Sequence, residues 1–401
     1  MIQSKLASKC PLKRADSIPL ESSQANETVQ INGAIRNDPR FKSLPWTEKY
    51  RPQQISSFTH NKDLINLFNN STASGNISHF LFYGPPGTGK TSAILAIARE
   101  IFCEFFHERC IEFNASDDRG INAVREKISN EARKSVSETV SVTGKRIPGY
   151  KIIILDEADS MTDEAQDALR VIIEQYSRVT RFCFICNFYC KITDAIKSRC
   201  SIVFFKQLSR ECMLSRLTLI AERELMELKP NIIETIINVS NGDLRRAIII
   251  LQNLKNSYDF KKLYAKEFTD MSLRELEIVN LNPNRKFSTE ISVNDVYMIA
   301  ATITIDRARK IVTEVQKCKK MTELSKIARK TIASGYPVDN ILMQLNEAIL
   351  SDKSLNDYKK ATILKYSGQI FMRMRECGIE YFQLLDYITC VNAVTNGWKH
   401  C

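Results

Sequence analysis

The chain has 401 residues, a length that indicates two or three domains rather than one core. Hydrophobic residues make up 44% and charged residues 26%, which is ordinary for a globular protein. Because no apolar run could span a bilayer and no secretory stretch opens the chain, we expect an intracellular protein without a membrane partner. The net charge of +11 is compatible with a polyanionic partner, although a solvated, lysine-rich surface would give the same balance.

The first 43 residues differ in character from the rest of the chain. Residues 1–43 are polar and lack periodicity, so we predict a disordered tail there. A loose basic cluster within it consists of Lys5, Lys9, Lys13 and Arg14. Such a cluster could serve as a nuclear address, but clusters this short are also common by chance.

Residues 44–205 alternate short apolar runs with helical patterns, which indicates an α/β domain built on a parallel sheet. The runs are apolar throughout rather than at alternate positions, as in strands that are buried on both faces. Strands are predicted at 79–83, 110–114, 151–155, 182–186 and 201–205. Helical periodicity appears between them at 92–102 and at 165–176.

The remainder of the chain is predicted to be largely helical. Residues 206–255 have the pattern of a small helical lid with two apolar faces. These faces are formed by Leu214, Leu217 and Ile220, and by Leu244, Ala247, Ile248 and Leu251. Residues 256–290 are polar and mixed, as in a linker or an insertion, and residues 291–401 form a further all-α domain.

The strongest local signal is a glycine-rich segment between a predicted strand and a predicted helix. Residues 84–91 satisfy G-x-x-x-x-G-K-[ST], the pattern of a loop that wraps its backbone around phosphates and points a helix N-terminus at them. We expect Lys90 to contact the β and γ phosphates and Thr91 to ligate Mg²⁺. The predicted nucleotide-binding residues of this segment are Gly84, Pro85, Pro86, Gly87, Thr88, Gly89, Lys90, Thr91 and Ser92.

Polar residues follow two of the predicted strands, at the edge where parallel sheets bind ligands. Asp156 and Glu157 follow the strand at 151–155, so we expect Asp156 to hold Mg²⁺ and Glu157 to orient and polarise the attacking water. A solvated acidic turn is the alternative, but the position after a buried strand favours the catalytic interpretation. Asn187 follows the next strand, where its side chain could reach the γ-phosphate, although asparagine at a strand end is also a common turn former.

The chain contains 12 scattered cysteines. Cys183 and Cys186 have the spacing of zinc ligands, with Cys190 close behind. A structural zinc site normally needs four ligands, and no second pair of this spacing occurs. We therefore predict reduced cysteines buried in the core rather than a metal centre.

Six motifs occur in one order along the chain. They lie at 46–52, 84–91, 114–120, 156–161, 198–200 and 242–246. Their series resembles the small subunits of replication factor C, which are clamp loaders of the AAA+ class. The wording TRFCFICNF with ILDEADSMT is most similar to subunit four in the human scheme. The resemblance is close over 44–254 and extends to the C-terminal helices only by their helical pattern.

The resemblance implies an AAA+ P-loop ATPase domain with a parallel five-stranded sheet, a helical lid and an all-α collar domain that mediates oligomerisation. It implies a hetero-pentameric ring with other clamp-loader subunits in the nucleus. Such a ring uses ATP and Mg²⁺ to open the sliding clamp and to load it on primer–template DNA, and its ATPase activity is stimulated by DNA and the clamp.

The resemblance also implies roles for individual residues. The residues that would line the adenine pocket are Thr47, Tyr50, Arg51, Pro52 and Thr59. Asn187 would be sensor 1, and Arg245 on the lid would be sensor 2. Arg199 would be an arginine finger that reaches the ATP of the neighbouring subunit, whereas without the resemblance it would be taken for a surface arginine.

A predicted basic helix carries the candidate DNA contacts. Arg119 and Gly120 open this helix, and Arg125 and Lys127 lie off its apolar stripe. A helix N-terminus with arginines suits phosphate oxygens without reading bases. A solvated basic face is the alternative, and the resemblance implies that these helices follow the DNA backbone.

Two other functions compete with ATP-driven clamp loading. The Asp-Glu-Ala-Asp string at 156–159 would also fit a nucleic-acid helicase, but one motor domain followed by a lid and an all-helical tail is a different layout. The second alternative is a structural ring subunit that binds ATP without hydrolysing it. Intact Lys90, Asp156 and Glu157 argue against such a degenerate site.

Overall fold

The computed structural model describes residues 44–396 apart from 56–57, 59–64, 69, 71–74, 76, 117–123, 143, 271–290 and 377, and without the side chains of 124–125 and 261–270. The predicted tail at 1–43 and the second part of the predicted linker therefore lie outside the described residues. Within the described part of the chain, no helix is long and apolar enough to cross a membrane.

The central sheet has five parallel strands in the order β2-β5-β6-β1-β7. Its strands are β1 (Phe80–Tyr83), β2 (Cys110–Asn114), β5 (Lys151–Asp156), β6 (Thr180–Cys186) and β7 (Ser201–Phe204). Each overlaps one of the five predicted runs, so the predicted parallel sheet is confirmed. Because all the strands run the same way, the loops after β1, β5 and β6 meet at one edge of the sheet.

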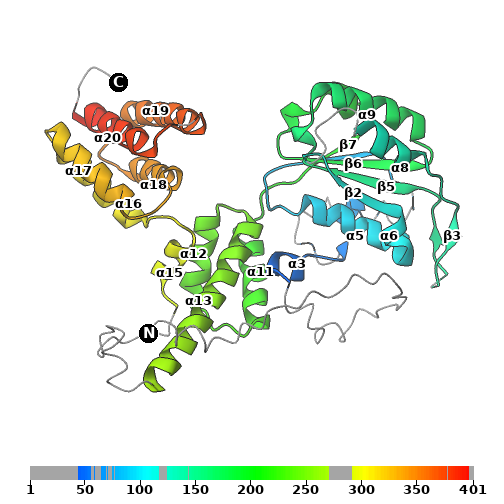
Figure 1. Ribbon diagram of the computed structural model, residues 1–401, viewed down its shortest axis with the longest axis horizontal. Coiled ribbons are helices and arrows are strands. Elements are labelled where there is room, and N and C mark those ends of the chain that lie inside the picture. The colour runs from blue at the N-terminus through cyan, green and yellow to red at the C-terminus, as the bar shows by residue number, and fades with distance from the viewer. Residues whose placement is uncertain are drawn as a thin grey trace, which may run out of the picture. The chain divides into compact units, whose positions relative to one another are not determined.

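Helices cover both faces of the sheet, with α5 (Lys90–Phe102) on one face and α9 (Asp163–Tyr176) on the other (Figure 1). Successive β5 side chains pack into different cores: Ile152 and Ile154 lie in the core that contains α5, and Ile153 and Leu155 in the core that contains α9. Burial on both faces explains why these strands are apolar throughout.

Short elements complete this domain. They are the helices α6 (Phe106–Arg109), α8 (Ser129–Arg133) and α10 (Asp194–Lys197), the 3-10 helices at Cys103–Phe105, Ala158–Ser160 and Tyr189–Lys191, a π-helical turn at Val124–Ile128 and the antiparallel ribbon of β3 (Thr139–Val140) and β4 (Arg146–Ile147).

The cysteines of β6 lie in the hydrophobic cores, as predicted. Cys183 and Cys186 are both buried. Burial raises the pKa of Cys186 to about 12 and that of Cys183 well above its usual value. Both thiols therefore stay protonated at neutral pH, whereas metal ligation and nucleophilic chemistry need the thiolate.

The helical lid has its own core, separate from the cores of the sheet. Its helices are α11 (Arg210–Arg223), α12 (Pro230–Ser240) and α13 (Leu244–Asp270), joined by α15 (Val293–Ile299) and by α3 (Trp46–Lys49) from the start of the described chain. Trp46 of α3 packs in this core with Leu217 of α11 and Leu251 of α13. The segment that opens the α/β domain in sequence is thus anchored to the lid that follows that domain.

Two details of the lid differ from the predicted pattern. Leu214 is 43% exposed, and Met213 takes its place in the buried face with Leu217 and Ile220. Positions 213, 217 and 220 are spaced by four and three residues, which is the helical repeat, so they align better on one face than 214 does. In addition, α13 continues through Asp270, so the boundary predicted at 255 falls inside a helix.

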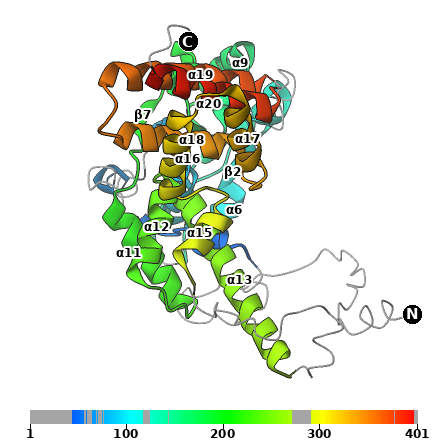
Figure 2. The same ribbon diagram turned by 90° about the vertical axis from the view of Figure 1, so that its left-hand side faces the viewer.

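The C-terminal helices form an all-α domain, which we call the collar (Figures 1 and 2). They are α16 (Ile305–Lys317), α17 (Met321–Ile332), α18 (Val338–Ser351), α19 (Asp357–Arg375) and α20 (Glu380–Asn396). A single core holds them together, with Ile341 and Leu345 of α18 against Leu384 and Ile388 of α20. The predicted all-α architecture is confirmed.

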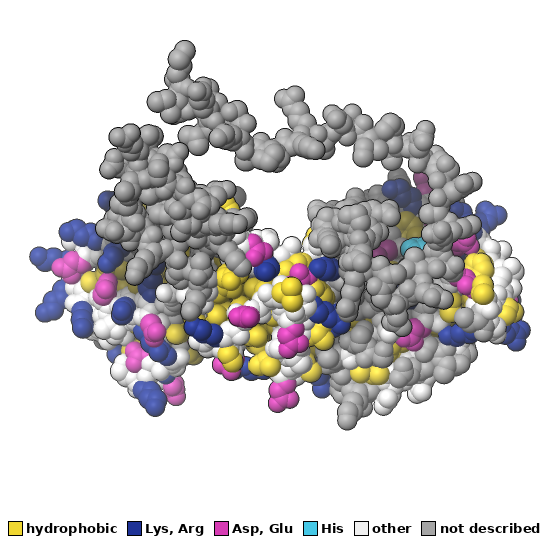
Figure 3. All heavy atoms as spheres, turned by 90° about the horizontal axis from the view of Figure 1, so that it is seen from below, with side chains coloured by type: hydrophobic (Ala, Val, Ile, Leu, Met, Phe, Trp, Pro, Cys, Tyr) yellow, Lys and Arg dark blue, Asp and Glu magenta, His cyan; other side chains and the backbone are white. Residues whose placement is uncertain are grey.

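The collar carries much of the chain's basic surface. Lys and Arg side chains gather over the collar, which is at the left of Figure 3. Exposed basic residues on α16 and α17 are Arg307, Arg309, Lys310, Lys317, Lys326, Arg329 and Lys330. The positive charge is therefore not confined to the predicted phosphate loop or to the predicted DNA helix.

Candidate nucleotide site

The glycine-rich loop joins β1 to α5 at the carboxyl edge of the sheet. Gly89 has φ +87° and ends the loop in the left-handed conformation from which α5 begins at Lys90. A glycine adopts this conformation without a steric cost, and the turn aims the N-terminus of α5 into the loop. Since a helix N-terminus attracts anions, the fold supplies a phosphate-binding cradle.

Lys90 is largely buried at the base of this cradle. Its Nζ donates to the backbone oxygens of Gly84 at 2.7 Å and Pro85 at 2.9 Å, and to Asn187 Oδ1 at 2.8 Å. Burial lowers the pKa of the Lys90 amine, and the nearby carboxylate of Asp156 opposes that effect. Phosphate oxygens can replace these acceptors around the ammonium group. Lys90 therefore lies where it could make the predicted contact with the β and γ phosphates.

The carboxylate at the end of β5 faces the start of α5. Asp156 Oδ2 accepts a hydrogen bond from Thr91 Oγ1 at 2.8 Å. Adjacent ligands of an octahedral Mg²⁺ ion with bonds of 2.0–2.1 Å lie about 2.9 Å apart, so these two oxygens fit neighbouring positions around one ion. The donor set is made of hard oxygens, which Mg²⁺ prefers.

Glu157 follows directly and is exposed in the cavity wall. Its backbone is left-handed, with φ +54°, and its N–H donates to Asp156 Oδ1 at 2.9 Å. A non-glycine residue in this region carries conformational strain, which is commonly kept where a side chain must point in a functional direction. Both Asp156 and Glu157 line the cavity, although they are adjacent in the chain.

The loop after β6 is held by a residue that the sequence analysis did not single out. Asp159 Oδ2 accepts from the backbone N–H groups of Asn187, at 3.3 Å, and Phe188, at 3.2 Å. Because Asp159 lies in the 3-10 helix after Glu157, the loop that carries Asn187 is tied to the acidic segment. Asp159 is the fourth residue of the Asp-Glu-Ala-Asp string, and that motif was the sequence feature that could have identified it.

A cavity extends from the phosphate loop to the lid. The predicted residues that line it are Thr47, Tyr50, Arg51, Pro52, Pro86, Gly87, Thr88, Gly89, Lys90, Thr91, Ser92, Asp156, Glu157, Asn187 and Arg245. Six others were not predicted, namely Glu48, Phe58, Leu208, Arg216, Leu244 and Ile248. The apolar members suit an adenine ring. Leu244 and Ile248 were predicted only as part of an apolar face of the lid, and nothing in the local sequence assigns that face to the nucleotide site.

Polar contacts fix the segment at 46–52 against both the lid and α5. The backbone oxygen of Tyr50 accepts from Arg216 Nη2 at 2.6 Å, and the Tyr50 hydroxyl donates to Glu224. Arg51 Nε donates to Ser92 Oγ at 3.1 Å. One short segment therefore joins α11 of the lid to α5 of the phosphate site, so the wall of the cavity is built from both domains.

Some predicted site residues lie elsewhere. Gly84 and Pro85 contribute the two backbone oxygens that bind Lys90 rather than lining the cavity. Arg199 also lies outside this cavity. Thr59, Arg119 and Gly120 fall outside the described residues, as does the side chain of Arg125. Lys127 is exposed in the π-helical turn, as a DNA-contacting residue would need to be.

Gly87 is the point at which the lid approaches the phosphate loop. It has φ +70°, and a Cβ there would lie 1.8 Å from Asp243 Oδ1 at the start of α13. We expect Gly87→Ala to weaken ATP binding about tenfold or more, because alanine is strained at this φ and the Asp243 side chain, which accepts a hydrogen bond from the backbone N–H of Arg246, must move away. Calorimetric titration with ATP would measure this. The matched control is Gly335→Ala, which has φ +78° but open space around it, and equal effects in both variants would contradict a lid contact.

Comparison with known proteins agrees with this geometry. Residues 80–208 match the AAA family, described as the ATPase family associated with various cellular activities. Residues 304–390 match the replication factor C C-terminal domain, and they lie within the collar. The fold and the site therefore define an ATP-binding member of the AAA ATPases.

Full-length relatives narrow the class further. A putative replication factor C small subunit of Acanthamoeba polyphaga mimivirus is 58% identical over 355 residues, which cover 88% of this chain and 98% of that protein. Replication factor C subunit 2 of Schizosaccharomyces pombe is 35% identical over 354 residues, which cover 88% of this chain and 95% of that protein. Human replication factor C subunit 4 is 34% identical over 360 residues, which cover 90% of this chain and 91% of that protein.

The chain belongs to the replication factor C small subunits, the AAA+ clamp-loader family of DNA replication. This confirms the family that the ordered motifs predicted. Among these relatives the human protein is subunit 4, in agreement with the resemblance to subunit four in the human scheme.

Proposed function

We propose that this chain binds ATP with Mg²⁺ and hydrolyses it as one subunit of a hetero-pentameric ring. The ring opens the sliding clamp and loads it on primer–template DNA, and the proposal includes residence in the nucleus. The observation that supports it best is one cavity in which Lys90, Asp156 and Glu157 come together with Arg245 of the lid. A charged residue from the lid beside the phosphate loop lets nucleotide binding alter the position of the lid.

The residues divide the chemistry between them. Lys90 and the N-terminus of α5 bind the phosphates, and Thr91 and Asp156 hold Mg²⁺, which neutralises charge that develops during phosphoryl transfer. Glu157 orients and polarises the attacking water. Asn187 contacts both the γ-phosphate and that water, since its loop is fixed by Asp159 and its side chain already meets Lys90. Arg245 senses the phosphates from the lid.

Arg199 acts on the nucleotide of the neighbouring subunit. It lies outside its own chain's nucleotide cavity, in the middle of the short loop between α10 and β7. A cation supplied by another subunit stabilises the transition state only once the ring has assembled. This arrangement makes hydrolysis depend on assembly.

DNA binding is proposed for Arg119, Gly120, Arg125 and Lys127, which the sequence places on one predicted helix. Replacing Arg119 and Arg125 with alanine should weaken binding to all DNA sequences about equally. It should also reduce the slope of log affinity against log salt by about one unit for each phosphate that is no longer neutralised. Fluorescence anisotropy with two unrelated duplexes over a salt series would measure both effects.

The control for that experiment is an alanine pair on the collar. Arg307 and Arg309 are exposed and equally charged, but they lie far from the predicted helix in sequence. If their replacement changed the salt slope as much as the Arg119 and Arg125 pair did, general charge rather than a defined interface would explain the binding.

The function itself is tested by assembly and turnover. The chain should co-purify with other clamp-loader subunits, and the assembled ring should hydrolyse ATP faster when DNA and the clamp are added. Duplex unwinding by the isolated chain would instead support a helicase. Normal assembly with ATP binding at this site but without turnover there would support the structural ring subunit.

A further inference from the structure

We infer that Glu174 is a positioning residue for Arg199, and that it fixes the guanidinium group to α9 before the neighbouring subunit's nucleotide arrives. The inference rests on the proposed role of Arg199 as a finger acting on another subunit. It assigns a function to a carboxylate that lies outside the nucleotide cavity and that no motif marks.

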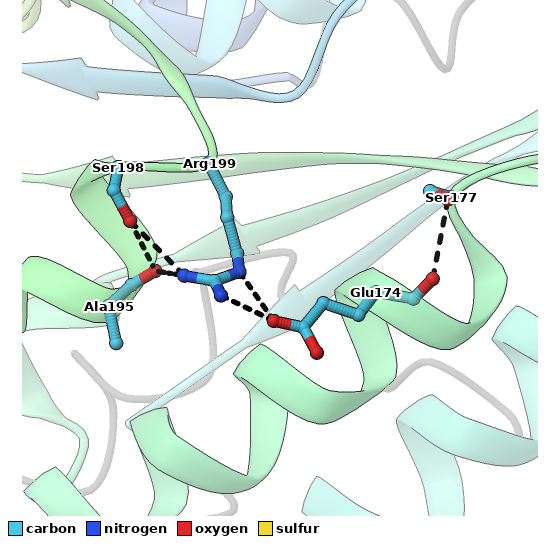
Figure 4. Close-up of polar contacts among 5 residues, drawn as sticks. All are labelled: Glu174, Ser177, Ala195, Ser198 and Arg199. Carbon is cyan, nitrogen blue, oxygen red and sulfur yellow. Dashed lines mark hydrogen bonds and ion pairs between the residues drawn. The ribbon is translucent and has the colours of Figure 1, made fainter.

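The contacts hold the guanidinium from two sides (Figure 4). On the α9 side, Arg199 Nε donates to Glu174 Oε1 at 2.8 Å, and Nη2 binds the same oxygen. On the α10 side, Nη1 donates to the backbone oxygen of Ala195 at 2.7 Å and to Ser198 Oγ at 3.1 Å. Both ends of the planar group therefore have partners, so its orientation as well as its position is set.

The pair lies where a second subunit can reach it. The side chains of Arg199 and Glu174 are 31% and 51% exposed. Exposed ion pairs of this kind contribute little to folding, so a purely structural role explains the contact poorly. A guanidinium group has five N–H donors, and the contacts above use at most four, so at least one remains for a phosphate oxygen.

Glu174 belongs to a rigid element. It lies in the last turn of α9, and Ser177 Oγ donates to its backbone oxygen at 3.3 Å. The inner face of α9 is packed on the sheet through buried Leu169, Ile172 and Ile173. The arginine is thus attached to a packed helix as well as to its own loop.

Preorganisation gives this attachment a kinetic consequence. A freely moving arginine side chain has several rotatable bonds, and it loses conformational entropy when those bonds become fixed on binding a phosphate. When Glu174 has already restricted those bonds, less entropy is lost in the transition state. Removing Glu174 should therefore slow hydrolysis at the neighbour's site without changing how that site binds ATP.

The test uses assembled rings in which only the neighbour's site can hydrolyse ATP. We expect Glu174→Ala in this chain to lower the kcat at that site by about tenfold, with KM for ATP within about twofold of its original value. Glu174→Gln keeps an oxygen acceptor and should recover most of the rate. Combining Glu174→Ala with Arg199→Ala should be no worse than Arg199→Ala alone, because the two residues act as one unit.

The matched control is Glu211→Ala, which removes an exposed carboxylate from α11, and gel filtration verifies that every ring is intact. Suppose that Arg199→Ala lowers turnover at the neighbour's site, but Glu174→Ala leaves that turnover unchanged or raises it. The positioning role of Glu174 would then be wrong, while the proposed role of Arg199 as an arginine finger would be supported. If Arg199→Ala itself had no effect, the proposed action on the neighbour would fail, and the inference with it.

Discussion

Glu157→Gln is expected to retain ATP while losing most of the hydrolysis at this site. The contacts proposed for the phosphates and Mg²⁺ come from Lys90, Thr91 and Asp156, whose hydrogen bonds do not involve the Glu157 side chain. An amide cannot accept the proton that a carboxylate takes from the attacking water. Groups in this role contribute about 10²–10⁴ in rate, so a decrease within that range is expected.

The local geometry indicates that this substitution changes the carboxylate without disturbing the backbone. Glu157 is exposed in the cavity wall and makes its turn with φ +54°, a conformation that glutamine can adopt as readily as glutamate. The hydrogen bond from its backbone N–H to Asp156 Oδ1 does not depend on the Glu157 side chain. Folding and nucleotide affinity should therefore stay close to those of the original protein.

Single-turnover hydrolysis and ATP affinity, measured on the same assembled rings, separate chemistry from binding. The comparison variant is Lys90→Ala, which should lose ATP affinity because Lys90 is the buried ammonium group of the cradle. An undiminished single-turnover rate in the Glu157 variant would show that another group activates the water.

The sheet and the chemistry at its edge could be predicted because both depend on local patterns. A strand buried on both faces must be apolar at every position, so β5 and β6 were visible as uninterrupted runs. Residues that follow parallel strands meet at one edge, so the spacing from strand to motif was enough to bring Lys90, Asp156 and Asn187 into one site.

The missed features all depend on contacts between residues distant in the chain. Nothing near Trp46 indicates that its side chain packs with Leu251, or that its backbone N–H donates to Gln252 Oε1 at 3.1 Å. Arg216 and Glu224 had no signal as partners of Tyr50 for the same reason. Leu214 was misplaced because adjacent apolar residues on α11 compete for one buried face, and only packing decides between them.

Arg199→Ala is expected to depress hydrolysis in the adjacent subunit while leaving this chain's own ATP affinity nearly intact. The guanidinium group pairs with Glu174 outside its own nucleotide cavity, so its removal takes no contact from the bound nucleotide. Arginine fingers in other phosphoryl-transfer systems contribute about 10³–10⁵ in rate. We expect a decrease at or below the lower end of that range, because the proposed finger would also sense nucleotide.

Mixed rings decide which site depends on Arg199. In one ring only the neighbour's site can hydrolyse ATP, and in the other only this chain's own site can. The variant should impair the first ring and spare the second, while Arg210→Ala, which removes an exposed arginine from α11, should spare both. The isolated chain should show no change in ATP affinity, since the finger has no nucleotide to reach until the ring has assembled. A defect confined to the second ring would mean that Arg199 serves its own nucleotide, which would require the α10–β7 loop to move from its position beside α9.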